Sequence, residues 1–393
     1  MEKYNEVKDK IPLLRFRNFQ QCKSWNKGTI DSIIECESSQ LTLGKLNLSD
    51  KGYPIYGADG IIGYITFYNK NHMYISIVKD GSGVGRLNLC QAYSSLLGTL
   101  NYLFSKDEKA YQIQWIYYLL QTIDFSNYIK GSGIPHIYFN DYKKHIIYIP
   151  SFDEQREIAD CLSSLDELIE ATAQKVETLK EHKKGLMQRL FPAEGKNVPD
   201  LRFLEFQGAE EWKESSLDEY FDFKQGFQCP VEEQYDKQEH GMVRFIRIID
   251  LTQPSTPYRY INDPGNQYYI NKENLFMVRY GDPGLVGIGY EGIIANNLFQ
   301  LIPKKKINPY FFYFLFSKEK TRIKGLSSST SLSAINFTSL KAFKIVVSQN
   351  TDEQQKIADC FSSIDELIEV ISRKVEILKE HKKGLMQQLF PKI

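Results

Sequence analysis

The chain has 393 residues, of which 42% are hydrophobic and 25% charged, and 49 basic residues balance 49 acidic ones. This length exceeds what one hydrophobic core usually organises, so we expect at least two domains, and the composition excludes a wholly disordered chain. The neutral charge balance permits a nucleic-acid partner but gives no argument for one.

The sequence offers neither a membrane anchor nor a metal site. Residues 1–10 are charged, and the longest apolar run, Tyr310–Phe316, is far too short to cross a bilayer. The six cysteines lie far apart without a Cys-x-x-Cys pair, which is typical of reduced structural thiols. We therefore expect a cytoplasmic protein whose own chain holds no metal and no cofactor.

Residues 1–150 are predicted to form a first mixed α/β domain. After a leading segment at 11–31, residues 53–68 and 73–87 show strand–turn–strand patterns with glycine turns. Residues 111–123 have the pattern of a helix, and residues 131–150 predict a turn followed by a strand.

Residues 151–192 predict one long helix that ends before Pro192. A second leading segment at 198–218 then opens a second α/β domain, residues 193–350. Within it, strands are predicted at 242–251 and around glycine turns at 274–302, a helix at 308–326, and a loop and strand at 327–347. Residues 351–393 predict a second long helix.

The two long helices are copies of each other. DEQREIADCLSSLDELIEATAQKVETLKEHKKGLMQRLFP (153–192) recurs as DEQQKIADCFSSIDELIEVISRKVEILKEHKKGLMQQLFP (352–391), with 30 of 40 positions identical. The leading segments also align, since Pro12, Arg15 and Trp25 correspond to Pro199, Arg202 and Trp212. The chain is therefore two repeated halves, each built as leading segment, variable region and long helix.

Each long helix carries a heptad seam of apolar residues, interrupted by Thr172 and by the pair Lys183 and Lys382. Its members are Ile158, Leu162, Leu165, Ile169, Val176 and Leu179 in the first copy, and Ile357, Phe361, Ile364, Ile368, Val375 and Leu378 in the second. A helix of some 35 residues is about 50 Å long and cannot bury its own stripe. We expect the two copies to pack antiparallel within one chain, although a parallel coiled coil between two chains stays open. Ser151-x-x-Glu154 and Thr351-x-x-Gln354 are candidate helix starts.

This plan resembles the specificity subunit of type I restriction-modification systems over essentially the whole chain. The resemblance rests on the duplicated helices, the Pro-x-Leu-Arg-Phe leading segments, and the strings YPIYGADGIIGY and GIPHI in the first variable region. It implies an α/β fold with two target-recognition domains separated by two long antiparallel coiled-coil helices and an internal two-fold repeat.

The resemblance also implies a function. The two domains would each read one half of a bipartite asymmetric site in double-stranded DNA, and the helices would fix the gap between the halves. The implied partners are two methylation subunits, which use S-adenosylmethionine to modify adenine N6, and optional restriction subunits that use ATP and Mg²⁺.

Base and phosphate contacts need hydrogen-bonding or basic side chains on protruding loops. The first region offers Lys79, Ser82, Arg86, Lys130, Ser132 and His136. The second region offers Lys224, Gln225, Arg244, Arg279, Asn296, Asn297, Lys324, Ser328, Ser329 and Thr330. An ordinary surface or turn role competes with DNA contact at every one of these positions.

No catalytic motif is recognisable in the sequence. The glycines at 281–289 resemble a nucleotide loop, but a strand pattern follows them where such a loop requires a helix. Asn308-Pro-Tyr-Phe lacks the second proline of the amino-methyltransferase loop. We therefore expect a non-catalytic subunit; a stand-alone DNA methyltransferase or nuclease, or a coiled-coil scaffold, are the alternatives.

Overall fold

The computed structural model describes residues 11–253, 255–327 and 334–391. The chain folds as two compact units. The first unit combines residues 1–174 with 372–393, and the second contains residues 175–371. The long helices α5 (Phe152–Leu190) and α9 (Thr351–Leu389) each pass from one unit into the other along the chain.

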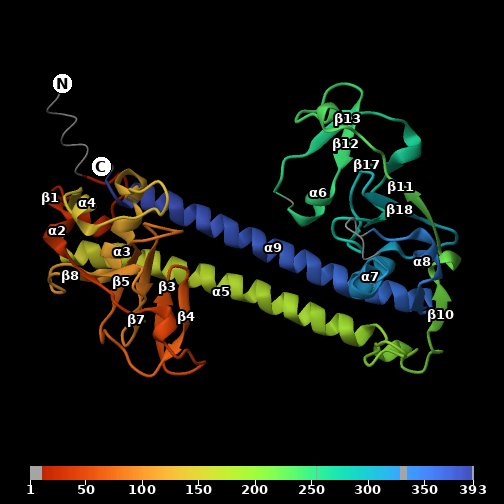
Figure 1. The fold of residues 1–393 in the computed structure, drawn as a ribbon, viewed down its shortest axis with the longest axis horizontal. Helices are drawn as coiled ribbons and strands as arrows, with labels where there is room; N and C mark the ends of the chain where they lie inside the picture. The colour runs from red at the N-terminus through yellow and green to blue at the C-terminus, as the bar shows by residue number, and fades with distance from the viewer. Residues whose placement is uncertain (1–10, 254, 328–333, 392–393) are drawn as a thin grey trace. The chain divides into compact units, whose positions relative to one another are not determined.

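The first unit is a mixed α/β structure (Figure 1). Its four-stranded antiparallel sheet has the order β2-β8-β5-β6, and a three-stranded sheet has the order β4-β3-β7, with β3 parallel to β7. The strands are β2 (Ile34–Ser38), β3 (Tyr53–Gly57), β4 (Gly60–Ile65), β5 (Tyr74–Val78), β6 (Leu87–Cys90), β7 (Ser95–Leu96) and β8 (Leu100–Ser105). The pair β1 (Asn26–Thr29) and β9 (Ile146–Ile149) is antiparallel.

Short helices complete this unit: α2 (Ile30–Ile33), α3 (Ile113–Gln121) and α4 (Phe139–Tyr142). Because α3 alternates large apolar side chains at helical spacing, it buries Trp115, Ile116 and Leu119 against β5, β6 and β8. The core also takes in Ile158 and Leu162 of α5, Leu389 of α9 and Phe390, which follows α9.

The second unit has a similar arrangement built from different sequence, with four strands in its second sheet where the first unit has three (Figure 1). Its sheets have the orders β11-β18-β15-β16 and β13-β12-β17-β14, with β12 parallel to β17, beside the antiparallel pair β10 (Lys213–Ser216) and β19 (Lys344–Val347). The remaining strands are β11 (Phe221–Gln225), β12 (Met242–Ile246), β13 (Arg259–Asn262), β14 (Tyr269–Ile270), β15 (Leu275–Val278), β16 (Val286–Gly287), β17 (Gly292–Ile294) and β18 (Leu298–Pro303). Helices are α6 (Ile248–Thr252), α7 (Pro309–Lys324) and α8 (Phe337–Ala342).

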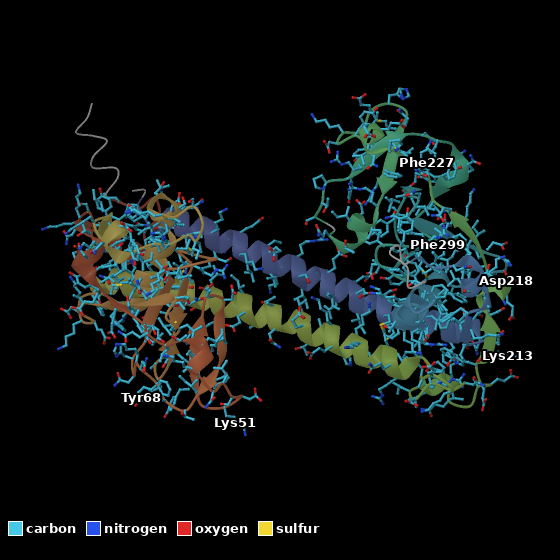
Figure 2. The ribbon with its side chains drawn as sticks, in the orientation of Figure 1. Lys51, Tyr68, Lys213, Asp218, Phe227 and Phe299 are labelled. Atoms are coloured by element: carbon cyan, nitrogen blue, oxygen red, sulfur yellow. The ribbon has the colours of Figure 1, made fainter. Side chains whose placement is uncertain are left out.

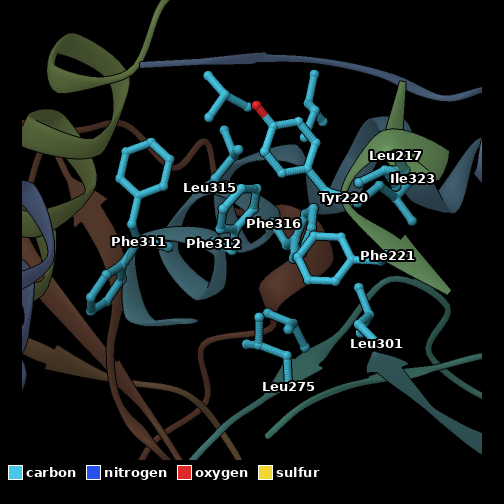
Figure 3. Close-up of a cluster of buried hydrophobic side chains, with 14 of the residues drawn as sticks. Leu217, Tyr220, Phe221, Leu275, Leu301, Phe311, Phe312, Leu315, Phe316 and Ile323 are labelled. Carbon is cyan, nitrogen blue, oxygen red and sulfur yellow. The ribbon is translucent and has the colours of Figure 1, made fainter. Parts of the chain in front are cut away.

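The aromatic run of α7 forms the centre of this core, as Figure 3 shows. Phe311, Phe312 and Phe316 are fully buried. They meet Phe221, Leu275 and Leu301 from the strands and Tyr220, which precedes β11. Phe299 on β18 is also fully buried, whereas Lys213 on β10 lies at the surface (Figure 2). These aromatic side chains of α7 therefore belong to the hydrophobic core and do not form a surface on which bases could stack.

Within each unit, one end of α5 packs beside the opposite end of α9. Lys382 reaches Asp166 at 2.6 Å in the first unit, and Lys183 reaches Asp365 at 2.5 Å in the second. These two lysines interrupt the apolar seams because their ammonium groups bridge to the facing helix, each above an aromatic ring, Tyr118 or Phe314. All twelve predicted seam residues are buried or half-buried.

Four sequence predictions differ in detail from the structure. In the segment 131–150, the short helix α4 precedes the predicted strand, which is β9. Residues 242–251 form β12 only to Ile246, and α6 follows because Asp250 accepts the Arg247 amide at the start of a helical turn. The segment 327–347 includes the short helix α8 ahead of its strand. Helix α9 is capped by the side chain of Asn350, which accepts the amides of Asp352 and Glu353, and not by Thr351.

Candidate nucleic-acid interface

Two predicted DNA-contacting loops of the first unit lie side by side. The first, Lys79–Arg86, joins β5 to β6, and the second is Lys130–His136. The Gly81 amide donates to Pro135 O at 2.9 Å, and the Ile137 amide donates to Lys79 O at 2.8 Å. Gly131 has φ +92°, and a Cβ there would lie 2.5 Å from Ile134 O, so this turn requires glycine.

A third loop contacts Arg86 of the first loop. The sequence prediction did not include this third loop. Arg86 forms an ion pair with Asp59 and donates to Ala58 O at 3.4 Å, both in the turn between β3 and β4. The sequence prediction did not include the Gly-Ala-Asp-Gly string of this turn among the contact sites. Its position between two predicted strands indicates an exposed turn, which would have identified it as a candidate.

The side chains of these loops differ in their exposure and in the hydrogen bonds and ion pairs that they form within the protein. Ser82 and Ser132 are exposed, and His136 is half-buried with Nδ1 3.3 Å from Ile134 O. Lys130 is exposed and pairs with Asp141 at 2.5 Å, which lowers the pKa of that carboxyl. Tyr138, beside His136, is 53% exposed and belongs to the same surface, although the sequence analysis omitted it.

The second unit gathers four of the predicted residues at one corner. Arg279 donates to Gln225 Oε1 at 2.7 Å and to Ile335 O at 3.2 Å, and it lies over the Phe337 ring. Gln225 in turn donates to Asn296 O. These contacts orient the guanidinium, so Arg279 also holds three chain segments together.

The corners of the two units have the same backbone frame. The Lys79 amide donates to Thr99 O and the Lys79 carbonyl accepts from Ile137, while the Arg279 amide donates to Asn297 O and the Arg279 carbonyl accepts from Ile335. Lys79 and Arg279 therefore occupy corresponding positions after corresponding strands, β5 and β15. One frame thus presents different side chains in the two units.

The remaining predicted residues lie elsewhere. Lys224 donates to Gln267 O, and Arg244 lies 3.7 Å from the Tyr258 ring centroid with its carboxylate partner Asp250 buried. Lys324, at the end of α7, is exposed and 4.0 Å from Asp282. Ser328, Ser329 and Thr330 lie outside the described residues.

Within the described parts of the chain, no group of three or more His, Cys, Asp or Glu residues is arranged to hold a metal ion. In the same ranges, no helix is long and apolar enough to cross a membrane. Burial raises the pKa of the Cys36 thiol to about 11 and that of Cys90 to about 12, so neither is poised as a thiolate nucleophile.

Comparison with known proteins identifies the family to which this architecture belongs. Residues 23–181 and 209–380 match the type I restriction modification DNA specificity domain. The chain is 26% identical over 409 residues to a putative type I restriction enzyme specificity subunit of Methanocaldococcus jannaschii, covering 93% of each chain. A putative type I specificity subunit of Mycoplasma pneumoniae is 23% identical over 382 residues, covering 94% of this chain and 96% of the relative.

Solved structures share the fold. The S subunit of a type I restriction-modification system from M. genitalium superposes with a TM-score of 0.69 at 20% identity, over 98% of this chain and 100% of that one. A structure described in connection with complex assembly of the type I R-M system gives a TM-score of 0.53 at 13% identity, over 93% and 96% of the two chains. The two matched domains together span most of the residues, and the chain therefore belongs to the family of type I restriction-modification specificity subunits.

Proposed function

We propose that each unit reads one half of a bipartite, asymmetric DNA site and that partner subunits carry out all catalysis. The observation that carries this proposal is the shared frame around Lys79 and Arg279. A conserved frame with different side chains suits two related readers of different sequences, because base recognition depends on the donors and acceptors presented to the groove.

The loops of the first unit supply suitable chemistry. Ser82 and Ser132 offer hydroxyl donors and acceptors, and Lys130 and Arg86 offer cations whose exposed ion pairs exchange readily for phosphate contacts. In the second unit, Gln225 and Arg279 act with Asn296 and Asn297 at the matching corner. Their mutual hydrogen bonds fix the donor directions before DNA arrives, which reduces the entropy lost on binding.

Catalysis is assigned to other subunits. The glycines at 281–289 surround the β15–β16 hairpin, and a dinucleotide loop would have to open a helix there. We propose two methylation subunits that bind S-adenosylmethionine and modify adenine N6. Restriction subunits, where present, would bind ATP and Mg²⁺. The two copies of the long helix would provide one place each for a methylation subunit.

The experiment measures methyl transfer from labelled S-adenosylmethionine to duplex DNA. The rigorously purified chain is expected to show no methylation and no cleavage alone, and to give adenine methylation when its methylation subunits are added. Activity retained by the single chain would favour a stand-alone enzyme. Failure of the assembled complex to bind any duplex would favour a scaffold.

A further inference from the structure

The first unit contains a cavity of about 840 Å³ between the end of α3 and the last turns of α9. It is separate from the loops assigned to DNA. Its lining includes Gln121, Thr122, Ile123, Asp124, Asn127, His145, Lys379, Lys382, Lys383, Met386, Gln387, Phe390 and Pro391. The lining combines apolar side chains with basic and polar ones.

The repeat shows what the second unit has at the corresponding place. Helices α3 and α7 begin at equivalent points, since Tyr118 and Phe314 lie under the equivalent lysines Lys382 and Lys183. Yet α3 has 9 residues and α7 has 16. The second unit therefore continues its helix for about two further turns where the first unit stops.

Those further turns of α7 cover the end of α5. Lys318 donates to Pro192 O at 2.6 Å, Arg322 pairs with Glu194 at 3.5 Å, and Ile323 is fully buried. Arg322 also lies over Phe343, whose counterpart in the first unit is His145. In the first unit, the corresponding end of α9 at Phe390 and Pro391 faces the cavity instead.

Three lysines and His145 are among the polar residues that line the cavity. The Nδ1 atom of His145 lies 2.6 Å from the Tyr128 hydroxyl, and Nε2 is buried, so neither ring nitrogen is open to an occupant. Burial lowers the pKa of His145. Within residues 11–253, 255–327 and 334–391, the Lys383 ammonium forms no ion pair.

The other charged groups of the lining are already engaged. Lys379 pairs with Glu376 and Lys382 with Asp166, and both ion pairs are partly exposed to solvent. The Asp124 carboxylate accepts the Ser126 amide of its own turn. An occupant would meet the unpaired ammonium of Lys383, the partly exposed ion pair of Lys379, and the apolar side chains of Ile123, Met386 and Phe390.

We propose that this cavity receives a short amphipathic helical segment of a methylation subunit, with an apolar side chain against Ile123, Met386 and Phe390 and carboxylates against Lys379 and Lys383. The inference rests on the proposed function, because it takes the methylation subunit as the partner. The apolar part of the lining favours a peptide over DNA phosphates, which need no apolar surface. Two turns of helix are also what the second unit places at the equivalent point.

Under this proposal, the two units bind their methylation subunits through different contacts. The first unit docks its methylation subunit through the cavity, and the second unit, whose own helix fills the place, docks without it. A substitution in the cavity should therefore release one methylation subunit and leave the other.

The repeat supplies matched variants for the test. Lys383→Glu with Gln387→Glu changes two cavity residues on an exposed face of α9, and Lys184→Glu with Gln188→Glu makes the same change at the equivalent positions of α5. Full-length proteins are titrated with the methylation subunit of the same system, and native mass spectrometry counts bound subunits. Thermal melting checks that both variants fold.

The cavity variant is expected to bind one of its two methylation subunits at least 10-fold more weakly, and the α5 variant is expected to resemble the unaltered chain. Equal behaviour of the two variants would overturn the inference. So would a cavity variant that keeps both methylation subunits but loses DNA affinity, because that result indicates a phosphate site. An unaltered chain that binds no methylation subunit would contradict the proposed function as well.

Discussion

At the scale of single residues, a duplicated buried ion pair fixes each leading segment to the start of a long helix. Arg15 binds Glu154 through two hydrogen bonds of 2.8 and 2.6 Å, with side chains only 5% and 3% exposed. Arg202 and Glu353 repeat the contact, and Trp212 Nε1 donates to Glu353 as well. Arg15 donates both hydrogen bonds, and its pKa is raised by this contact with Glu154. An arginine side chain is not deprotonated in proteins, so its charge persists when the pair is broken.

Glu154→Gln is expected to lower the free energy of unfolding by roughly 3–5 kcal/mol, because it leaves the buried Arg15 cation without its counter-charge. Urea denaturation followed by circular dichroism measures this. Glu177→Gln is the control, since the Glu177–Lys180 pair is exposed and is expected to contribute less than about 1 kcal/mol. Equal losses in the two variants would show that Arg15 does not depend on Glu154.

The sequence predicted two candidate loops in the first unit, but neither the contact between them nor which of their side chains form hydrogen bonds or ion pairs. Glycines and polar residues between strand patterns marked 79–86 and 130–136 correctly as loops, and the structure brings them together. The sequence pattern does not show which residues contact each other across the fold. It therefore did not indicate that Arg244 stacks on Tyr258 or that Gln225 accepts a hydrogen bond from Arg279. Those contacts join residues far apart in sequence. Whether any of these residues touches a base stays a prediction.

At the scale of elements, the long helices were the most predictable part of the chain. Heptad spacing over some 35 residues specifies a helix independently of its surroundings, and helices of 39 residues form at both copies. The starts were less certain, because a cap depends on one side chain. Asn350 aligns with Ser151 in the repeat and caps α9, and Ser151 Oγ accepts the Glu154 amide at 3.4 Å.

Asn350→Ala is expected to cost about 1 kcal/mol of unfolding free energy, the typical value for a lost N-cap. Thr351→Ala, one residue later, should cost clearly less because the Asn350 carboxamide still accepts both amides. Urea denaturation of the two variants compares them directly. A larger loss for Thr351→Ala would place the cap at Thr351.

The long helices α5 and α9 are also proposed to set the distance between the two half-sites. Inserting one heptad after Val176 and one after Val375 preserves the apolar seam and lengthens each helix by roughly 10 Å. That length matches about three base pairs, which also rotate the second half-site by roughly 100°. Methylome mapping should show both half-site sequences kept with a longer gap and poorer occupancy, or no modification at all. Full modification at the original spacing would mean that the helices do not set the gap.

At the scale of the whole molecule, the internal repeat predicted the architecture better than any local motif. Two variable regions of unlike sequence form sheets of matching order, β2-β8-β5-β6 and β11-β18-β15-β16. The sequence indicated two α/β domains because leading segments and long helices recur around each region. The greater length of α7 was already visible in the predicted helices at 111–123 and 308–326, whereas the cavity beside α3 was not predictable because it depends on tertiary packing.

The central claim is that the two units read separate half-sites, and exchange of one reader tests it most directly. Residues 217–350 are replaced by the corresponding region of a related specificity subunit, and the altered chain is expressed with its methylation subunits. Mapping of methylated adenines is then expected to show one half-site sequence changed and the other retained. A change in both half-sites, or in neither, would contradict independent reading by the two units.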